Sequence, residues 1–317
     1  MTRVAVLDDY QRIAASMAAW SCIPEGDVEF FYDYLPDEDT RVQRLQPFDV
    51  IVAMRERTPF TRGLIDRLPN LKLLITTGMG NASFDMAALK QRGIVVCGTG
   101  GQRTATAELA WGLILALVRN IAYEDAAMRA GGWQTTIGPS LDKRVLGVIG
   151  LGRLGSQVAG VGRAFGMEVI AWSRNLTPER AAEHGVRLVT KDQLLAQSDV
   201  VSIHVGLSDS SRGLIGAREL ALMRPDAYLV NTSRGPIVDE AALIDALESK
   251  RIAGAALDVY DIEPLPADHR LRRTPNTVLT PHLGYVTTDS YRIFYGDALE
   301  NILAFLNGAP TRVIEAR

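Results

Sequence analysis

The sequence predicts two α/β domains, each built on a parallel, doubly wound sheet. Short apolar runs rich in Val and Ile recur along the 317 residues, and helix-length amphipathic stretches separate them. The runs lack polar alternation, which is typical of strands covered by helices on both faces. About eleven such runs exceed one comfortable sheet, and the length itself suggests two domains of ~150 residues.

Each predicted strand is one of these apolar runs. Those in the first third are Val4–Leu7, Val28–Tyr32, Val50–Ala53, Leu73–Thr76 and Ile94–Cys97. Those that follow are Val145–Ile149, Glu168–Trp172, Val200–His204, Ala227–Val230, Ala253–Leu257 and Val278–Thr280.

The segments between the two strand groups predict where the domains join. Glycines in residues 98–102 suit a crossing segment, and residues 104–129 predict one long helix with Leu109, Leu113 and Leu117 on its apolar face. Residues 288–306 predict a helix with no strand after it. This last helix could pack back on the first domain and make that domain discontinuous.

Composition excludes several function classes. Lys and Arg number 34 against 37 Asp and Glu, a net charge of −3, so the chain lacks the basic surface of nucleic-acid binders. Two cysteines cannot make a disulfide framework, and no Cys or His spacing suggests a metal. No run approaches the ~18 apolar residues of a membrane span. We therefore expect a cytoplasmic protein with no nucleic-acid or membrane partner and no metal.

A glycine-rich turn carries the first functional signal. Gly150, Gly152 and Gly155 form GxGxxG, with Arg153 and Leu154 between the last two, directly after the strand Val145–Ile149. A helix pattern and a second strand follow, which completes the βαβ context that a dinucleotide site requires. Gly150 permits the turn, Gly152 the approach of a pyrophosphate, and Gly155 close packing of helix on strand. The helix N-terminus then favours the phosphates.

The end of the second strand bears on the choice of dinucleotide. NAD sites usually place an acidic residue there, but this chain has Ser173 and Arg174. Arg174 could pair with a 2′-phosphate, which favours NADP, although a solvated Arg174 and use of either NADP or NAD stays an alternative. His204 ends a strand predicted to face the cofactor, where it makes either a structural hydrogen bond or a cofactor contact.

Three later strand ends predict a catalytic group. Arg234, Glu263 and His282 follow strands whose carboxyl ends meet at the ligand-binding edge of an open sheet. Arginine binds a carboxylate with two hydrogen bonds, histidine exchanges a proton near neutral pH, and a neighbouring carboxylate orients the imidazole and favours its charged form.

The chain resembles the D-isomer-specific 2-hydroxyacid dehydrogenase family over nearly its whole length. The landmarks are residues 146–155, 199–204, 231–240, 254–264 and 281–284. The resemblance implies two Rossmann-like doubly wound domains, with a nucleotide-binding domain of residues 102–287 inserted in a discontinuous flavodoxin-like substrate domain of residues 1–101 and 288–317. It also implies catalytic roles for Arg234, Glu263 and His282, and a homodimer formed through the nucleotide-binding domain.

The resemblance further implies binding residues. Asp258 matches a position that contacts the nicotinamide. Thr232 and Ser233 are expected on the same side of the cofactor pocket, and Gly284 belongs to the matching motif of residues 281–284. The substrate carboxylate would bind a loop of Gly78, Met79, Gly80 and Asn81, whose amides suit an anion. Arg55 or Arg57 is similar to a segment that reaches phosphate in phosphoglycerate enzymes, or else forms a surface pair with Glu56.

These features predict a reversible, NADP(H)-preferring dehydrogenase of a small 2-oxo acid such as glyoxylate, hydroxypyruvate or phosphohydroxypyruvate. Departures from the family pattern at residues 81–85, 97–100 and 206 surround the substrate pocket and leave the substrate open. The alternatives are a formate- or phosphite-type dehydrogenase of the same fold, and a corepressor-like protein that senses a dinucleotide.

Overall fold

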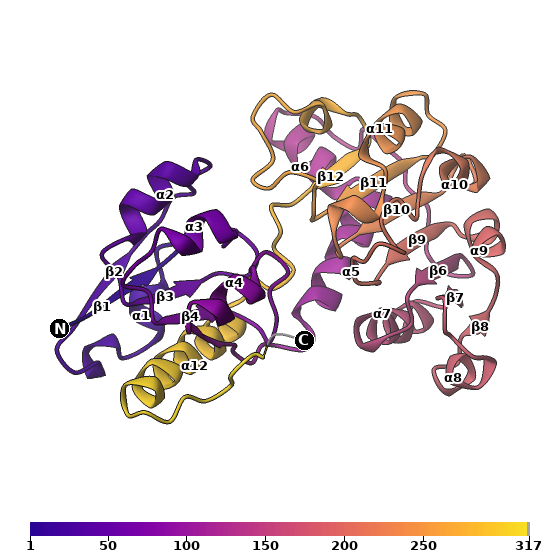
Figure 1. The fold of residues 1–317 in the computed structure, drawn as a ribbon. Helices are drawn as coiled ribbons and strands as arrows, with labels where there is room; N and C mark the ends of the chain where they lie inside the picture. Colours follow the sequence, from indigo (N-terminus) through magenta and orange to yellow (C-terminus); the bar gives the residue numbers. More distant parts are fainter. Residues whose placement is uncertain (316–317) are drawn as a thin grey trace. The chain divides into compact units, whose positions relative to one another are not determined.

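The computed structural model describes residues 1–315, and the chain divides into two compact units (Figure 1). Unit 1 contains Met1–Gln102 together with the C-terminal segment from Thr287, and unit 2 is Arg103–Val286. Unit 1 is therefore discontinuous in sequence.

Unit 1 is built on a parallel sheet in the order β2-β1-β3-β4-β5. Its strands are β1 (Thr2–Val6), β2 (Gly26–Phe30), β3 (Val50–Ala53), β4 (Leu73–Thr76) and β5 (Val95–Cys97). The short helices are α1 (Ala14–Met17), η1 (Trp20–Cys22), α2 (Glu38–Leu45), α3 (Arg62–Asp66) and α4 (Met86–Gln91). Every residue of β3 and β4 is buried, as their unbroken apolar sequences predict.

The C-terminal helix α12 (Thr288–Leu306) belongs to unit 1. Thr287 caps it by accepting a hydrogen bond from the Ser290 amide. The helix packs against α1 and β4, and it buries Tyr291 and Tyr295 almost completely. Figure 1 shows α12 in yellow beside the indigo N-terminal elements.

Unit 2 is built on a seven-stranded parallel sheet in the order β12-β11-β10-β9-β6-β7-β8. The strands are β6 (Val145–Ile149), β7 (Glu168–Trp172), β8 (Arg187–Leu188), β9 (Val200–Ile203), β10 (Tyr228–Asn231), β11 (Gly254–Leu257) and β12 (Thr277–Leu279). The order reverses between the neighbouring strands β6 and β9, and ligands of doubly wound sheets bind beyond the carboxyl ends at such a point.

Helices cover both faces of this sheet. The helices of the unit are α5 (Ala105–Val118), α6 (Ile121–Arg129), α7 (Arg153–Ala164), α8 (Pro178–Glu183), α9 (Lys191–Gln197), α10 (Ala217–Leu222), η2 (Gly235–Ile237), α11 (Glu240–Glu248) and η3 (Arg270–Arg273). Of these, α6 buries none of its residues and does not cover the sheet. Two clusters of buried apolar residues form the core of the unit. One contains Leu194 and Leu229, and the other contains Ile114 and Val158.

The prediction of a single helix over residues 104–129 is wrong. Asn120 adopts a left-handed backbone, with φ +52°, so α5 ends at Val118 and α6 starts at Ile121 with a bend of 61°. The apolar periodicity continues through the break, which explains the error. Strand β8 is also missing from the prediction, because an edge strand of two residues has no apolar run of its own.

No single helix in residues 1–315 is long and apolar enough to cross a membrane. Taken together, α5 and α6 reach that length and apolar composition, but they are bent by 61° where they join.

Candidate active site

The polar residues predicted in unit 2 follow the carboxyl ends of its strands. Gly150 follows β6, Ser173 follows β7, His204 follows β9, Thr232 follows β10 and Asp258 follows β11. Since every strand pair in this sheet is parallel, these ends lie along one edge. The fold of unit 2 alone therefore brings them together.

The glycine turn has the geometry that its spacing predicts. Gly150 has φ +98°, and its amide donates to Trp172 O at 2.8 Å. A Cβ on Gly155 would lie 2.0 Å from the Gly150 carbonyl oxygen, so only glycine lets α7 pack this closely. A Cβ on Gly152 would meet nothing within 4 Å, which leaves space in front of the helix N-terminus. Arg153 is exposed there, and Leu154 is half-buried against the core.

Two buried polar atoms beside this turn also fit a bound dinucleotide. Within the described residues, neither His204 Nδ1 nor Thr232 Oγ1 has a hydrogen-bond partner, although both atoms are buried. The other ring nitrogen of His204, Nε2, lies 2.8 Å from Ser202 Oγ. Burial lowers the pKa of His204 to about 4, so its ring is neutral at physiological pH. His204 thus makes a structural hydrogen bond through Nε2, and its buried Nδ1 has no partner among the described residues.

Ser173 and Arg174 lie at the end of β7, next to the glycine turn along the sheet edge. Arg174 is exposed, and its Nη2 donates to the carbonyl oxygen of Ser210 at 3.1 Å. This contact holds the guanidinium near the strand end, where the adenosine ribose of a dinucleotide lies in this fold.

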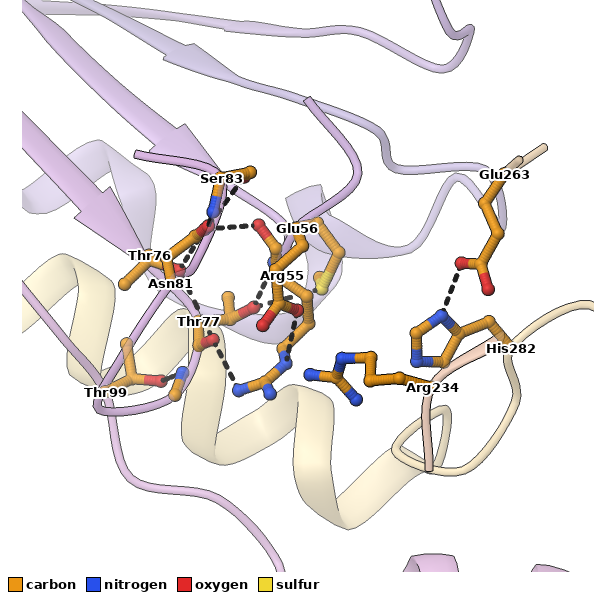
Figure 2. A network of polar contacts seen from close by, with 12 residues as sticks. Arg55, Glu56, Thr76, Thr77, Asn81, Ser83, Thr99, Arg234, Glu263 and His282 are labelled. Carbon is orange, nitrogen blue, oxygen red and sulfur yellow. Dashed lines mark hydrogen bonds and ion pairs between the residues drawn. The ribbon is translucent and has the colours of Figure 1, made fainter. Parts of the chain in front are cut away.

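His282 and Glu263 form a direct pair (Figure 2). His282 Nδ1 lies 2.6 Å from Glu263 Oε2, and the two side chains are 20% and 33% exposed. The other carboxylate oxygen of Glu263 accepts a hydrogen bond from the Tyr260 amide at 2.9 Å. Glu263 therefore orients the imidazole, while the pair stays accessible to a substrate.

Arg234 lies on the loop after β10 and is half-buried. Asn231, which is fully buried, accepts a hydrogen bond from the Ser233 amide at 3.0 Å and donates to Arg234 O at 3.0 Å. The Ser233 hydroxyl donates to Ile203 O at 2.9 Å, so it ties β10 to β9. Sequence reasoning missed Asn231 as the residue that shapes this loop.

Asp258 and Gly284 contact one another. Asp258 is completely buried, and its carboxylate accepts hydrogen bonds from Thr280 Oγ1 at 2.6 Å, Leu283 N at 2.7 Å and Gly284 N at 2.9 Å. Burial raises the pKa of Asp258, and the hydrogen bonds from Thr280, Leu283 and Gly284 and the nearby His282 oppose that shift. The Gly284 amide is therefore occupied by the protein itself.

Unit 1 carries the predicted substrate loop after β4. Gly78 has φ +89°, and its amide donates to Thr99 Oγ1 at 2.8 Å, so it is not available to an anion. Met79 is 59% exposed, and the amides of Met79 and Gly80 make no hydrogen bond to any residue that the structure describes. The amides of Met79 and Gly80 therefore fit the predicted binding of a carboxylate better than the amide of Gly78 does.

Asn81 supports this loop from within (Figure 2). Its Nδ2 donates to Arg55 O at 2.6 Å and to Thr76 Oγ1 at 2.9 Å, and its Oδ1 accepts from the Ser83 amide at 2.9 Å. The side-chain amide is thus used to hold the loop together.

Arg55 and Arg57 take different positions in unit 1. Arg55 has a left-handed backbone, with φ +51°, and its Nη1 donates to Thr77 O at 3.0 Å on the substrate loop. Arg57 instead donates to Asp8 O at 2.7 Å and stacks on the ring of Tyr10. Arg55 also pairs with Glu56 at 3.7 Å. Of the two arginines, Arg55 is the one placed at the loop.

The structure shows no group of three or more His, Cys, Asp or Glu side chains that could hold a metal ion in residues 1–315.

Comparisons with known proteins show the family to which the chain belongs. A family model described as D-isomer specific 2-hydroxyacid dehydrogenase, NAD binding domain, matches residues 111–284. The glyoxylate reductase of Aeropyrum pernix is 40% identical over 293 residues, which cover 89% of this chain and 87% of that protein. A crystal structure of phosphoglycerate oxidoreductase from Vibrio cholerae is 38% identical, with a TM-score of 0.93 over 98% of this chain and 100% of that chain.

A D-3-phosphoglycerate dehydrogenase of Synechocystis sp. is 36% identical over 284 residues, or 87% of this chain and 51% of that protein. The chain thus spans about half the length of this relative, and nearly all of the glyoxylate reductase. The reaction class common to these enzymes is hydride transfer between a nicotinamide cofactor and a small 2-oxo or 2-hydroxy acid. On the family model and the extent of these matches, the chain belongs to the D-isomer specific 2-hydroxyacid dehydrogenase family.

Proposed function

We propose that this protein is an NADP(H)-preferring dehydrogenase that acts chiefly as a reductase of a small 2-oxo acid. The observation that carries the proposal is the contact of 2.6 Å between His282 and Glu263 in the same unit as the glycine turn. Reduction of a carbonyl requires a proton donor, because the oxygen must gain a proton as the carbon gains a hydride. His282 is placed to be that donor, and Glu263 orients its ring.

In this proposal the bound cofactor supplies the hydride to C2 of the substrate. Arg234 binds the substrate carboxylate and polarises the 2-carbonyl. Protonated His282 gives its proton to the oxygen that becomes the hydroxyl. Glu263 keeps the ring oriented for that step. Unit 1 is the substrate-binding unit, where Met79 and Gly80 offer their amides and Arg55 its positive charge.

Cofactor choice rests on Arg174. Its position after β7, with no carboxylate at that strand end, supports NADP over NAD, although NAD stays usable. In the Arg174→Asp variant, kcat/KM for NADPH should fall by roughly 10-fold or more, because a charge-assisted contact with the 2′-phosphate is lost. Activity with NADH should be retained. Arg180→Asp, on the exposed helix α8, is the control, and equal losses with both cofactors would contradict the assignment.

The homodimer is supported by one exposed apolar surface. Ile121, Tyr123, Met128, Trp133 and Ile137 are between 52% and 97% exposed and follow one another along α6 and the segment after it. Single exposed apolar residues are ordinary, but several of them within one segment of the chain support an interaction surface. We place the dimer contact there. A cytoplasmic location accords with the two cysteines, Cys22 and Cys97, which are both free thiols.

The two alternatives to this function are a formate- or phosphite-type dehydrogenase and a dinucleotide sensor. A formate-type dehydrogenase carries an amide beside its histidine, and Glu263 in that place disfavours it; a phosphite-type enzyme is tested by adding phosphite to the substrates. A dinucleotide sensor would bind the cofactor without turnover. Because the catalytic residues can persist in such a sensor, turnover is the measurement that separates it from the enzyme.

The test is oxidation of NADPH and NADH with glyoxylate, hydroxypyruvate and phosphohydroxypyruvate, followed by absorbance. His282→Ala should lower kcat by ~10²-fold or more and leave the dissociation constant of NADPH nearly unchanged. His184→Ala, at the end of α8, is the matched control. Tight cofactor binding without turnover of any acid would favour the sensor.

A further inference from the structure

His282 has an unusual backbone conformation. Its φ is +55°, in the left-handed region that residues with a Cβ rarely adopt, and its amide donates to Thr280 O at 3.1 Å. Such a conformation persists only where the surroundings hold it, and it is frequent at active sites. The structure must therefore contain groups that fix residues on both sides of His282.

The carboxylate of Asp258 is such a group. Before His282, Thr280 Oγ1 donates to Asp258 Oδ1 at 2.6 Å. After His282, Leu283 N donates to the same oxygen at 2.7 Å, and Gly284 N donates to Oδ2 at 2.9 Å. One buried side chain thus binds the loop upstream and downstream of the histidine, and Thr106 Oγ1 adds a hydrogen bond to Gly284 O at 2.8 Å.

The same loop also holds the partner of His282. Two residues after Asp258, the Tyr260 amide donates to Glu263 Oε1 at 2.9 Å. The Tyr260 hydroxyl lies 2.9 Å from Thr280 O and 3.1 Å from Leu257 O, so it connects the ends of β11 and β12. Residues 258–263 therefore fix the histidine loop through Asp258 and the glutamate through Tyr260.

We infer that Asp258 is a positioning residue, whose buried carboxylate keeps His282 in the left-handed conformation that places its Nδ1 on Glu263. This inference rests on the proposed function for its effect on turnover. It gives Asp258 a role beyond the cofactor contact that the family resemblance implies. The carboxylate acts through the loop, because the groups that bind it are the hydroxyl of Thr280 and two backbone amides.

The first test compares Thr280→Val with Thr280→Ser. Valine removes the hydroxyl that donates to Asp258 and keeps the size and branching of the side chain, whereas serine keeps the hydroxyl. We expect kcat to fall by roughly 10-fold in Thr280→Val and to recover in Thr280→Ser. Equal effects of the two substitutions on kcat would overturn the role of the hydrogen bond.

The second test uses Asp258→Asn, which is similar in shape but places an amide N–H among donors. We expect kcat to fall by ~10²-fold with a changed pH profile of kcat, a loss larger than any rise in the dissociation constant of NADPH that the missing cofactor contact causes. A rise in that dissociation constant with unchanged kcat would assign Asp258 to the cofactor alone and overturn the inference. If Asp258→Asn does not fold, the pair of Thr280 variants decides.

The NMR signal of the His282 ring, assigned with His282→Gln, provides a readout that needs no turnover. Its chemical shift, followed against pH in the protein without substrate, should differ between the unmodified chain and Thr280→Val and be restored in Thr280→Ser. If no 2-oxo acid is turned over but this pattern is found, the proposed function fails and the positioning role stands. If turnover is found without this pattern, the positioning role fails.

Discussion

At the scale of single residues, Glu263 decides how the His282 ring is held. Glu263 Oε2 lies 2.6 Å from His282 Nδ1 and fixes the orientation of the imidazole. Glu263→Gln removes the charge and keeps the shape. We expect kcat for reduction to fall by ~10²-fold, because the ring loses the partner that orients it, and steady-state kinetics measures the loss. Glu248→Gln, an exposed partner of Arg270, should leave kcat unchanged.

Asp8 should make the stability of unit 1 depend on pH. It is 2% exposed, and burial raises its pKa from 3.8 to about 6, against the opposing hydrogen bond from Thr58. The folded state holds the proton of Asp8 more tightly than the unfolded state does. The protonated carboxyl therefore contributes fully to the free energy of unfolding below about pH 4, and this contribution is lost as the pH rises through about 6. A shift of this size corresponds to about 3 kcal/mol.

We therefore expect Asp8→Asn to raise the Tm at pH 8 and to flatten the change in Tm between pH 4 and 7, measured by circular dichroism. Asp66→Asn, which alters an exposed carboxyl at the end of α3, is the control. A variant that loses stability equally at pH 4 and pH 8 would contradict this account of Asp8.

At the scale of elements, the packing of α7 on β6 depends on one glycine. Gly155→Ala would place a methyl group 2.0 Å from Gly150 O, so the helix must move away from the turn. Overpacking of this kind costs about 1 to 3 kcal/mol. We expect the dissociation constant of NADPH, measured by fluorescence titration, to rise by roughly 10-fold. Gly160→Ala lies on the same helix in open space and should bind the cofactor normally.

Elements also show where a periodic pattern is insufficient. The apolar spacing of residues 104–129 suits one helix, yet the left-handed backbone of Asn120 divides it. Asparagine adopts this conformation more readily than most residues, but most asparagines do not adopt it. The sequence therefore does not reveal that Asn120 is one that does. By contrast, β3, β4, β6 and β7 begin and end at the residues that the sequence predicts. A short apolar run without polar alternation is typical of a strand buried on both faces, so the run itself marks the strand.

At the scale of the whole molecule, the exposed group on α6 and the segment after it predicts the oligomeric state. Trp133 and Ile137 are 72% and 97% exposed. We expect the protein to sediment as a dimer and the double variant Trp133→Glu, Ile137→Glu to sediment as a monomer, because two charges per protomer would be buried in the contact. Val161→Glu, on an exposed position of α7, should remain a dimer. A monomeric unmodified protein at micromolar concentration would exclude the dimer.

The sequence by itself determined the α/β class, most of the strands, the glycine turn and the chemical types at the strand ends. These depend on local patterns: apolar runs mark buried strands, and GxGxxG marks a turn that only glycine allows. Only the tertiary structure decided that Asn231 shapes the Arg234 loop, that the Gly78 amide is occupied by Thr99, and that Asp258 holds the residues around His282. The contacts of Gly78 and Asp258 join residues from different loops, and which loops meet depends on the order of strands in the sheet rather than on any neighbour in the sequence. The contact of Asn231 is local, three residues along the chain, but the residue types do not reveal that this side chain makes it.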